Sequence, residues 1–151
     1  MNALLQKIIN QAASDGWQYN VSSDTQAVIR VEDNSLSAIK TLDISITVMP
    51  ECISCMLAAW GLVHVSEERR AEAEALCNSL NSEGYYSIFF VDEEDDISAR
   101  CRFLAVTDVV PDRDGNRSIA NVQNMAICRA LMLCMVSEVN SVAAKLVQIS
   151  R

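Results

Sequence analysis

The amino-acid sequence predicts a single α+β domain over residues 1–151, with an antiparallel five-stranded sheet packed against helices in the order α-β-β-β-α-β-β-α. Three observations support this. Apolar residues recur at helical spacing in three segments, whereas five others alternate or cluster as strands do. Half of the 151 residues are apolar and 21% are charged, which is sufficient for a core without metal or disulfide support.

The N-terminal part of the chain predicts one helix followed by two strands. Residues 2–13 carry apolar side chains at helical spacing, and Gly16 follows as a stop. Residues 26–32 and 42–48 alternate between apolar and polar side chains, which is the period of a half-buried antiparallel strand.

The middle of the chain predicts a third strand and a second helix. Residues 52–65 are almost wholly apolar and indicate a buried strand, bent or bulged near Gly61. Ser66 is a suitable N-cap for the helix that follows, and Gly84 can adopt the left-handed conformation that ends it.

The C-terminal third predicts a hairpin and a long helix. Residues 85–91 are rich in aromatic and branched side chains, residues 97–105 alternate, and five acids at 92–96 form the turn between them. Residues 107–117 read as a polar loop. From residue 118 to about 148 the pattern indicates a helix with an apolar face wider than one sheet contact requires, so we expect a second buried contact there.

Several short stretches between Val65 and Phe103 carry a resemblance to a known family: Val65-Ser66 with Arg69 and Arg70, Leu80-Asn81, Gly84-Tyr85-Tyr86, Phe90-Val91-Asp92 and Ile97-Ser98-Ala99-Arg100. In these stretches, and in the order of its elements, the chain resembles the YbjN-like family, whose fold is that of type III secretion chaperones. The resemblance implies a chaperone-like fold and the capture of an extended polypeptide segment.

Charge and composition limit the kind of partner. Twelve basic and 20 acidic residues give a formal net charge of −8, which repels phosphate backbones and anionic lipid. We therefore expect neither nucleic acid nor membrane binding, and a polypeptide partner is electrostatically easier. Lys7 interrupts the first apolar run, so no export signal is expected, and residues 125–147 contain three charges that are costly in hydrocarbon. A cytoplasmic protein fits these features.

Cys52 and Cys55 form a Cys-x-x-Cys pair, the strongest superficial sign of an enzyme. A thioredoxin-like site places the first cysteine at a helix N-terminus, where the thiol pKa falls. Here the flanking residues indicate an extended chain, in which side chains three positions apart project from opposite faces. We favour core packing, and keep a small thiol redox enzyme or sensor using Cys52 and Cys55 as the alternative function. The other cysteines that lie in apolar segments are expected to pack as small hydrophobes: Cys77, Cys101, Cys128 and Cys134.

No motif predicts a catalytic, cofactor or metal site. The only histidine, His64, lacks a neighbouring nucleophile motif, and one Cys-x-x-Cys is insufficient for structural zinc. Residues 112–119 resemble the start of a calcium-binding EF-hand loop, but Arg117 replaces the required glycine and Gln123 the bidentate glutamate. The ligand-type side chains of that loop are Asp112, Asp114 and Asn116. The five consecutive acids are interpreted as a solvated turn.

These features together predict a non-catalytic protein-binding domain, chaperone-like or regulatory, which acts as a homodimer. Such a domain would use apolar pockets for anchoring side chains and a free sheet edge for main-chain pairing. Trp60, Tyr85 and Tyr86 are the candidate contact residues, because partly exposed aromatic side chains often supply binding hot spots. Core packing is the alternative for all three.

Overall fold

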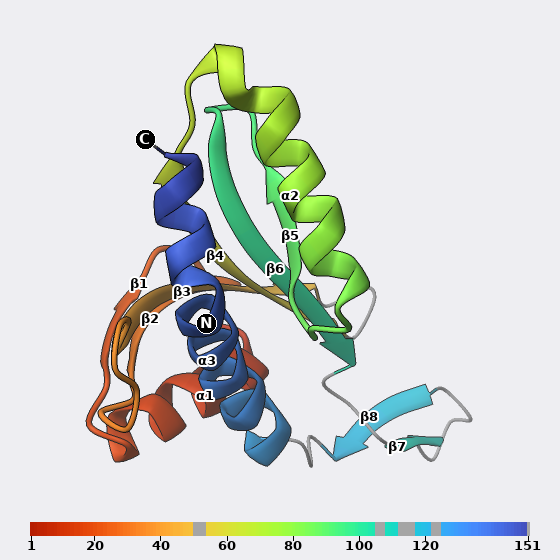
Figure 1. Ribbon diagram of the computed structural model, residues 1–151. Coiled ribbons are helices and arrows are strands. Elements are labelled where there is room, and N and C mark those ends of the chain that lie inside the picture. Colours follow the sequence, from red (N-terminus) through yellow and green to blue (C-terminus); the bar gives the residue numbers. More distant parts are fainter. Residues whose placement is uncertain (50–53, 105–107, 112–116, 122–124, 151) are drawn as a thin grey trace.

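The computed structural model of the protein describes residues 1–49, 54–104, 108–111, 117–121 and 125–150. Along the chain its elements are α1 (Ala3–Ser14), β1 (Gln18–Val21), β2 (Gln26–Glu32), β3 (Thr41–Met49), β4 (Ser54–His64), the 3₁₀ turn η2 (Glu67–Arg69), α2 (Arg70–Ser82), β5 (Ile88–Val91), β6 (Asp96–Leu104), β7 (Asp108–Pro111), β8 (Arg117–Asn121) and α3 (Met125–Ile149). Figure 1 shows α3 lying across the large sheet, and α2 running beside β5 and β6.

The large sheet is antiparallel and has the strand order β1-β2-β3-β4-β6-β5. The α+β class is confirmed, but the sheet has six strands and the predicted five are one too few. The additional strand, β1, has four residues, all exposed, which pair with β2 from Gln18↔Arg30 to Val21↔Ala27. So short a strand offers little periodicity in the sequence, and its partner strand holds it in place.

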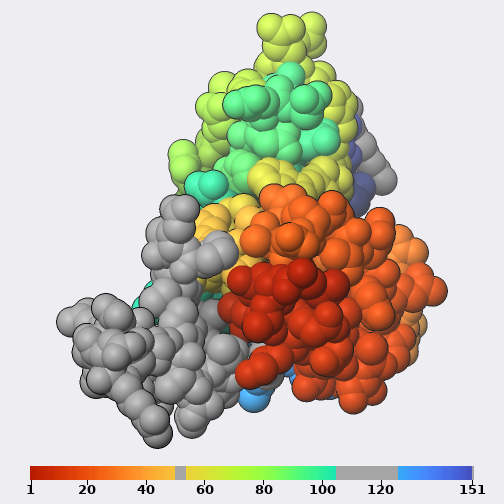
Figure 2. Space-filling view, turned by 180° about the vertical axis from the view of Figure 1, so that it is seen from behind, coloured from red at the N-terminus to blue at the C-terminus, as the bar shows by residue number. Residues whose placement is uncertain are grey.

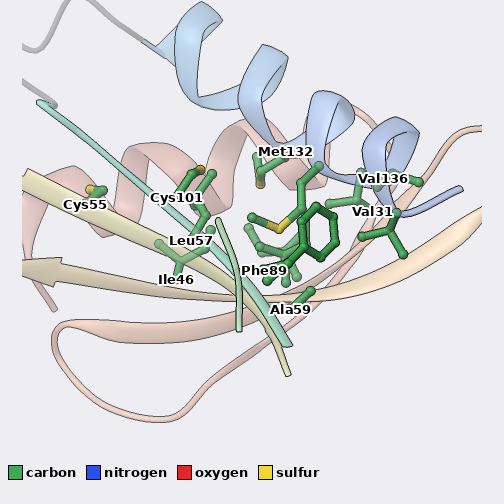
Figure 3. Packing of buried hydrophobic residues seen from close by; sticks show 14 of the residues in the cluster. Val31, Ile46, Cys55, Leu57, Ala59, Phe89, Cys101, Met132 and Val136 are labelled. Atoms are coloured by element: carbon green, nitrogen blue, oxygen red, sulfur yellow. The ribbon is translucent and has the colours of Figure 1, made fainter. Parts of the chain in front are cut away.

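One face of the sheet forms the core with α1 and α3. Buried side chains alternate along the strands as the sequence predicts, for example Ala27, Ile29 and Val31 in β2. Figure 3 shows Met132 and Val136 of α3 on the same side of the sheet as Val31 of β2 and the labelled side chains of neighbouring strands. By length and composition alone α3 could cross a membrane, but in this fold it is the helix that covers the sheet.

The ends of α1 and α2 follow the sequence with one exception. The Asn2 side chain accepts a hydrogen bond from the N–H of Leu4 at 2.9 Å and caps α1. Gly84 adopts a φ of 84° just after α2, in the left-handed conformation expected of it. Ser66 precedes η2 but its side chain makes no capping hydrogen bond, so the chain enters α2 through a 3₁₀ turn.

The hairpin of β7 and β8 replaces the loop predicted at residues 107–117 and the first turns of the predicted last helix. Val109 pairs with Ile119, and both are β-branched residues that favour strands. The last helix therefore begins at Met125, not at residue 118, because the apolar spacing before Met125 fits a strand equally well.

Two polar side chains of α3 hold loops of the sheet. Glu138 is 7% exposed and accepts hydrogen bonds from the N–H groups of residues 86–87, at 2.6 and 3.0 Å. Because this turn is bound to α3, β5 begins at Ile88, three residues later than predicted. Asn140 accepts hydrogen bonds from the N–H groups of residues 38–39 at 2.9 and 2.8 Å, and so fixes the loop before β3.

The two outer edges of the large sheet differ. Asn81 of α2 accepts a hydrogen bond from the N–H of Phe89 at 2.8 Å and donates one to its C=O at 2.9 Å. This contact closes the β5 edge to further strand pairing. At the β1 edge, the N–H of Ser22 donates a hydrogen bond to the C=O of Gln26. Along an antiparallel strand the main-chain groups point alternately toward and away from the partner strand, so those of Tyr19 and Val21 point away from the sheet.

Candidate functional site: an opening between two central strands

The large sheet opens between β3 and β4. Their ladder ends at Ser45↔Ala58, although β3 extends back to Thr41 and β4 continues to His64. Figure 1 shows β6 rising beside α2, whereas β1 and β2 turn toward the opposite side. In Figure 2, which shows the reverse side, the orange surface of the first strands meets the yellow and green surface of the later ones. The opening therefore lies between two halves of one sheet.

A bulge in β4 accounts for this divergence, because bulges bend a strand and increase its twist. The register of β4 on β6 shifts between Ala59 and Val63, and Gly61 within it has a φ of 62°. A Cβ at this position would be strained and would lie 3.3 Å from Oδ2 of Asp96. Its N–H donates to Ser98 Oγ at 3.0 Å. The bend predicted near Gly61 is confirmed.

The edge of β3 that faces the opening presents main-chain groups. Val48 N–H donates to the C=O of Thr25 at 2.8 Å, so the even-numbered residues of β3 bond toward β2. Thr41 and Asp43 therefore direct their N–H and C=O groups toward β4. Within the described residues these groups have no strand partner, because the β3–β4 ladder stops short of them.

The opening leads into a pocket of about 440 Å³ with α3 behind it. Its lining is almost wholly apolar or small: Ala38, Ile39, Thr41, Leu42, Asp43, Trp60, Gly61, Leu62, Val63, Val139, Ala143, Leu146 and Val147. Asp43, the one charged residue in this described lining, forms a two-pronged ion pair with Arg30 at 2.7 and 2.8 Å. Hydrogen bonding from this guanidinium holds the pKa of Asp43 below its ordinary value. We call this space the β3–β4 pocket.

A second pocket, of about 530 Å³, also borders Trp60. Its lining is Trp60, Arg70, Phe90, Val91, Asp92, Glu93 and Glu94, and we call it the acidic pocket. The Trp60 and Phe90 rings meet edge to face with centroids 5.8 Å apart. The guanidinium of Arg100 lies 4.9 Å from the centroid of Phe90, a cation–π contact.

The turn that forms one wall of the acidic pocket is internally bonded. The Asp92 carboxylate accepts the hydroxyl of Ser98 at 2.7 Å and the N–H groups of Glu94 and Asp96 at 3.0 Å each. Burial raises the pKa of Asp92, but these hydrogen bonds outweigh it and the pKa is lowered. The Oγ of Ser98 also accepts a hydrogen bond from the N–H of Gly61, so this one side chain links the turn to the bulge.

Only part of the acidic run is solvated. Asp95 pairs with Arg70 of α2, and Asp96 contacts Nδ1 of His64 at 2.8 Å. The His64 side chain is 72% exposed, which agrees with a surface role. Residues 93–94 are exposed, and among the described residues they form no ion pair.

The structure separates the three predicted contact residues. Trp60 is 52% exposed and borders both pockets. Tyr86 is 73% exposed on the turn that Glu138 holds, and Tyr85 packs edge to face on Phe89 with centroids 6.0 Å apart. Neither tyrosine lines either pocket. A contact with a partner stays a prediction for all three.

The cysteines are placed for packing. Cys55 is completely buried, and burial raises the pKa of its thiol to about 11, whereas a redox nucleophile needs a lowered pKa. Cys52 lies outside the described residues. The other described cysteines are also free, and burial raises each thiol pKa: to about 11 in Cys77 and Cys101, to about 12 in Cys128, and upward in Cys134.

Among the residues that the structure describes, no group of three or more His, Cys, Asp or Glu side chains is arranged to hold a metal ion. The EF-hand-like residues Asp112, Asp114, Asn116 and Gln123 lie outside the described residues. Arg117 begins β8, so a strand and not a helix follows that loop. This differs from the turn into a helix that the sequence indicated.

An α+β protein with a helix-backed, partly split antiparallel sheet is the class that these features define. No protein-family model matches the chain, and no curated protein matches its sequence. Among solved structures it is similar to the crystal structure of YbjN from E. coli, described as a putative transcription regulator, with a TM-score of 0.54 and 12% sequence identity over 93% of this chain and 92% of that one. The chain has a YbjN-like fold, as the resemblance between Val65 and Phe103 implied.

Sequence reasoning did not find most residues of the β3–β4 pocket. Leu42 and Val139 read as ordinary core positions of a strand and a helix, and nothing local shows that they border an opening. The available signal was Gly61, because a bulge in a central strand can separate it from its neighbour. Trp60 beside that glycine was identified for its exposure, and the structure places it at the opening.

Proposed function

We propose that this protein is a non-catalytic binding protein, chaperone-like or regulatory, that binds an extended segment of a polypeptide partner in the opening between β3 and β4. The observation that supports this best is the combination of unpaired strand and apolar pocket at one place. Thr41 and Asp43 offer main-chain groups to an added strand, and the pocket behind them receives a side chain. Main-chain pairing then contributes affinity and the pocket contributes specificity.

The dimensions suit one apolar anchor. Full burial of an aliphatic or aromatic side chain is worth about 1.5–3 kcal/mol, and the pocket of about 440 Å³ accommodates such a group. Val139 and Leu146 form a buried floor, whereas Leu62 and Ala143 are half-buried and would be covered by a ligand. Asn140 stabilises the loop wall of the pocket through its two hydrogen bonds, so the site is preformed.

The regulatory or chaperone-like role is compatible with the structural neighbour. YbjN is described as a putative transcription regulator, and regulation through a bound protein suits a chain of net charge −8 better than direct contact with phosphates. A type III secretion chaperone, the role that the fold resemblance implies, also binds polypeptide segments. Burial of Cys55 weighs against the alternative of a thiol redox enzyme.

The homodimer is part of the same proposal. On α3, Ala126, Ile127 and Ala130 are exposed, and Ile127 is one of the side chains that widen the apolar face of this helix and predict its second buried contact. Light scattering should then give a molar mass near twice 16.6 kDa, and Ile127→Glu should return the mass of one chain. A single-chain mass for the wild-type protein at micromolar concentration would contradict the dimer and leave the binding site unaffected.

Selection from a phage-displayed library of random dodecapeptides tests the binding site. Ala143→Phe places a ring in the β3–β4 pocket, and Ala75→Phe adds the same ring to an exposed position of α2, outside the pocket and outside the proposed dimer face. We expect the wild-type protein and Ala75→Phe to enrich peptides that bind both equally. Ala143→Phe, shown to be folded by thermal unfolding, should bind them at least tenfold more weakly. Equal binding by Ala143→Phe, or no enrichment by the wild-type protein, would overturn the proposal.

A further inference from the structure

The β3–β4 pocket and the acidic pocket meet at a single side chain. Trp60 lines both, half-exposed, with apolar residues on one side and Phe90 and the acidic turn on the other. The two linings have different chemistry. The first contains aliphatic residues from β3, β4 and α3, whereas the second combines two aromatic rings with three carboxylates. A chain that crosses Trp60 would therefore place side chains in two unlike environments.

The charges around Trp60 are unbalanced in favour of carboxylates. Among the described residues that line either pocket the only cation is Arg70, and it is already paired with Asp95 and with Glu74. Asp43 is satisfied by Arg30, and Asp92 by hydrogen bonds within its turn. Residues 93–94 are different, because they line the acidic pocket, are exposed, and form no ion pair among the described residues.

The aromatic side chains of the acidic pocket favour the same ligand. The face of a tryptophan ring attracts cations more strongly than other aromatic rings do, at about 0.5–1 kcal/mol for exposed sites. This chain itself places a guanidinium over Phe90, with Arg100 at 4.9 Å from the ring centroid. A second cation beside Trp60 would have an aromatic surface on one side and the carboxylates of Glu93 and Glu94 on the other.

We propose that the polypeptide segment bound by this protein carries a lysine or arginine close to its apolar anchor. The apolar side chain occupies the β3–β4 pocket, and the basic side chain, within three positions of it, occupies the acidic pocket between Trp60, Phe90 and Glu93–Glu94. This inference rests on the proposed function and specifies its partner by charge complementarity. The carboxylates accept charge-assisted hydrogen bonds, and the ring of Trp60 separates the two side chains.

The sequences of the selected dodecapeptides test this inference separately from the proposed function. With wild-type protein we expect an aliphatic or aromatic residue accompanied by Lys or Arg within three positions. Replacing that basic residue by Gln in a synthetic peptide should weaken binding about five- to thirtyfold in 50 mM salt. The double variant Glu93→Gln with Glu94→Gln should show a much smaller difference between the Lys and Gln peptides, because only the contact with the aromatic rings remains. Glu67→Gln with Glu68→Gln, on the exposed turn before α2, should keep the difference.

The outcomes separate the two ideas. Peptides that bind through an apolar anchor without any basic preference would overturn the inference and leave the proposed function in place. Retention of the full Lys preference by the Glu93→Gln, Glu94→Gln protein would also overturn it, because the recognising carboxylates would lie elsewhere. Failure of the wild-type protein to select any peptide would overturn both.

Discussion

Replacement of Asn81 by alanine should destabilise the protein, because this side chain closes the outer edge of the sheet. It makes two hydrogen bonds to Phe89, at 2.8 Å to the N–H and 2.9 Å to the C=O. Each such neutral hydrogen bond contributes about 1 kcal/mol net, so about 2 kcal/mol is lost. Alanine recovers about 0.5 kcal/mol through its higher helix propensity. The expected net loss in the free energy of unfolding is about 1.5 kcal/mol.

The matched control is Asn78→Ala, one turn earlier on an exposed position of the same helix. It makes the same chemical change at a position where only the higher helix propensity of alanine counts, so it should stabilise the protein by about 0.5 kcal/mol. Urea unfolding followed by far-UV circular dichroism measures the free energy of unfolding of both variants. With an m value of about 2 kcal/mol/M, the midpoint of Asn81→Ala should fall by about 0.7 M. Equal midpoints for the two variants would refute the reasoning that α2 fastens β5 through this side chain.

Three other predictions concern the core and the pocket. Asn140→Ala removes both hydrogen bonds to the loop before β3, so urea titration should show a free energy of unfolding lower by about 1–2 kcal/mol. An unchanged midpoint would show that the loop is held by other contacts. Stability should fall above pH 9, since burial raises the thiol pKa of Cys55 from 9.0 to about 11, so the unfolded chain loses its proton first. The slope should approach about 1.4 kcal/mol per pH unit for this thiol, and Cys55→Ala should be less pH-dependent than the wild-type protein between pH 9 and 11. Acrylamide should quench the fluorescence of Trp60, which is 52% exposed, and spare that of Trp17, which is 7% exposed. The Trp60→Phe variant should therefore lose the quenched part of the emission. Strong quenching that persists in this variant would place Trp17 in solvent.

The parts of the fold that follow from local sequence were predicted well. The alternation of Ile44, Ile46 and Val48 indicates a half-buried strand, and the structure confirms it because each residue faces the same core. The acidic hairpin after α2 and the left-handed Gly84 were also correct. Such features depend on neighbours a few positions apart, which the sequence displays directly.

The missed elements depend on partners distant in the chain. β1 is held as a strand by its pairing with β2, and its four exposed residues are too few to show a clear apolar periodicity in the sequence. The pairing of Val109 with Ile119 likewise converts a predicted loop and helix start into a hairpin. Local propensity was a weak guide at both places, because pairing decided the outcome.

The candidate site was predicted only in outline. Gly61 indicates a bulge and Trp60 an exposed aromatic, yet the opening exists because β3 and β4 separate while α3 spans the space behind them. The convergence of Asp43, Val139 and Leu62 at one pocket requires the three-dimensional path of three elements. The difference between Glu93–Glu94 and the other three acids was hidden in a run of five, because only the structure shows the hydrogen bonds and ion pairs of Asp92, Asp95 and Asp96.

Amide hydrogen exchange of the protein with and without a selected dodecapeptide measures most directly whether a partner chain pairs in the opening. If a partner strand pairs with β3, the amides of Thr41 and Asp43 should exchange at least tenfold more slowly in the complex, and those of Tyr19 and Val21 on the open β1 edge should not change. Slower exchange at Tyr19 and Val21, with Thr41 and Asp43 unaffected by a bound peptide, would contradict the proposal that the partner chain pairs with β3 in the opening.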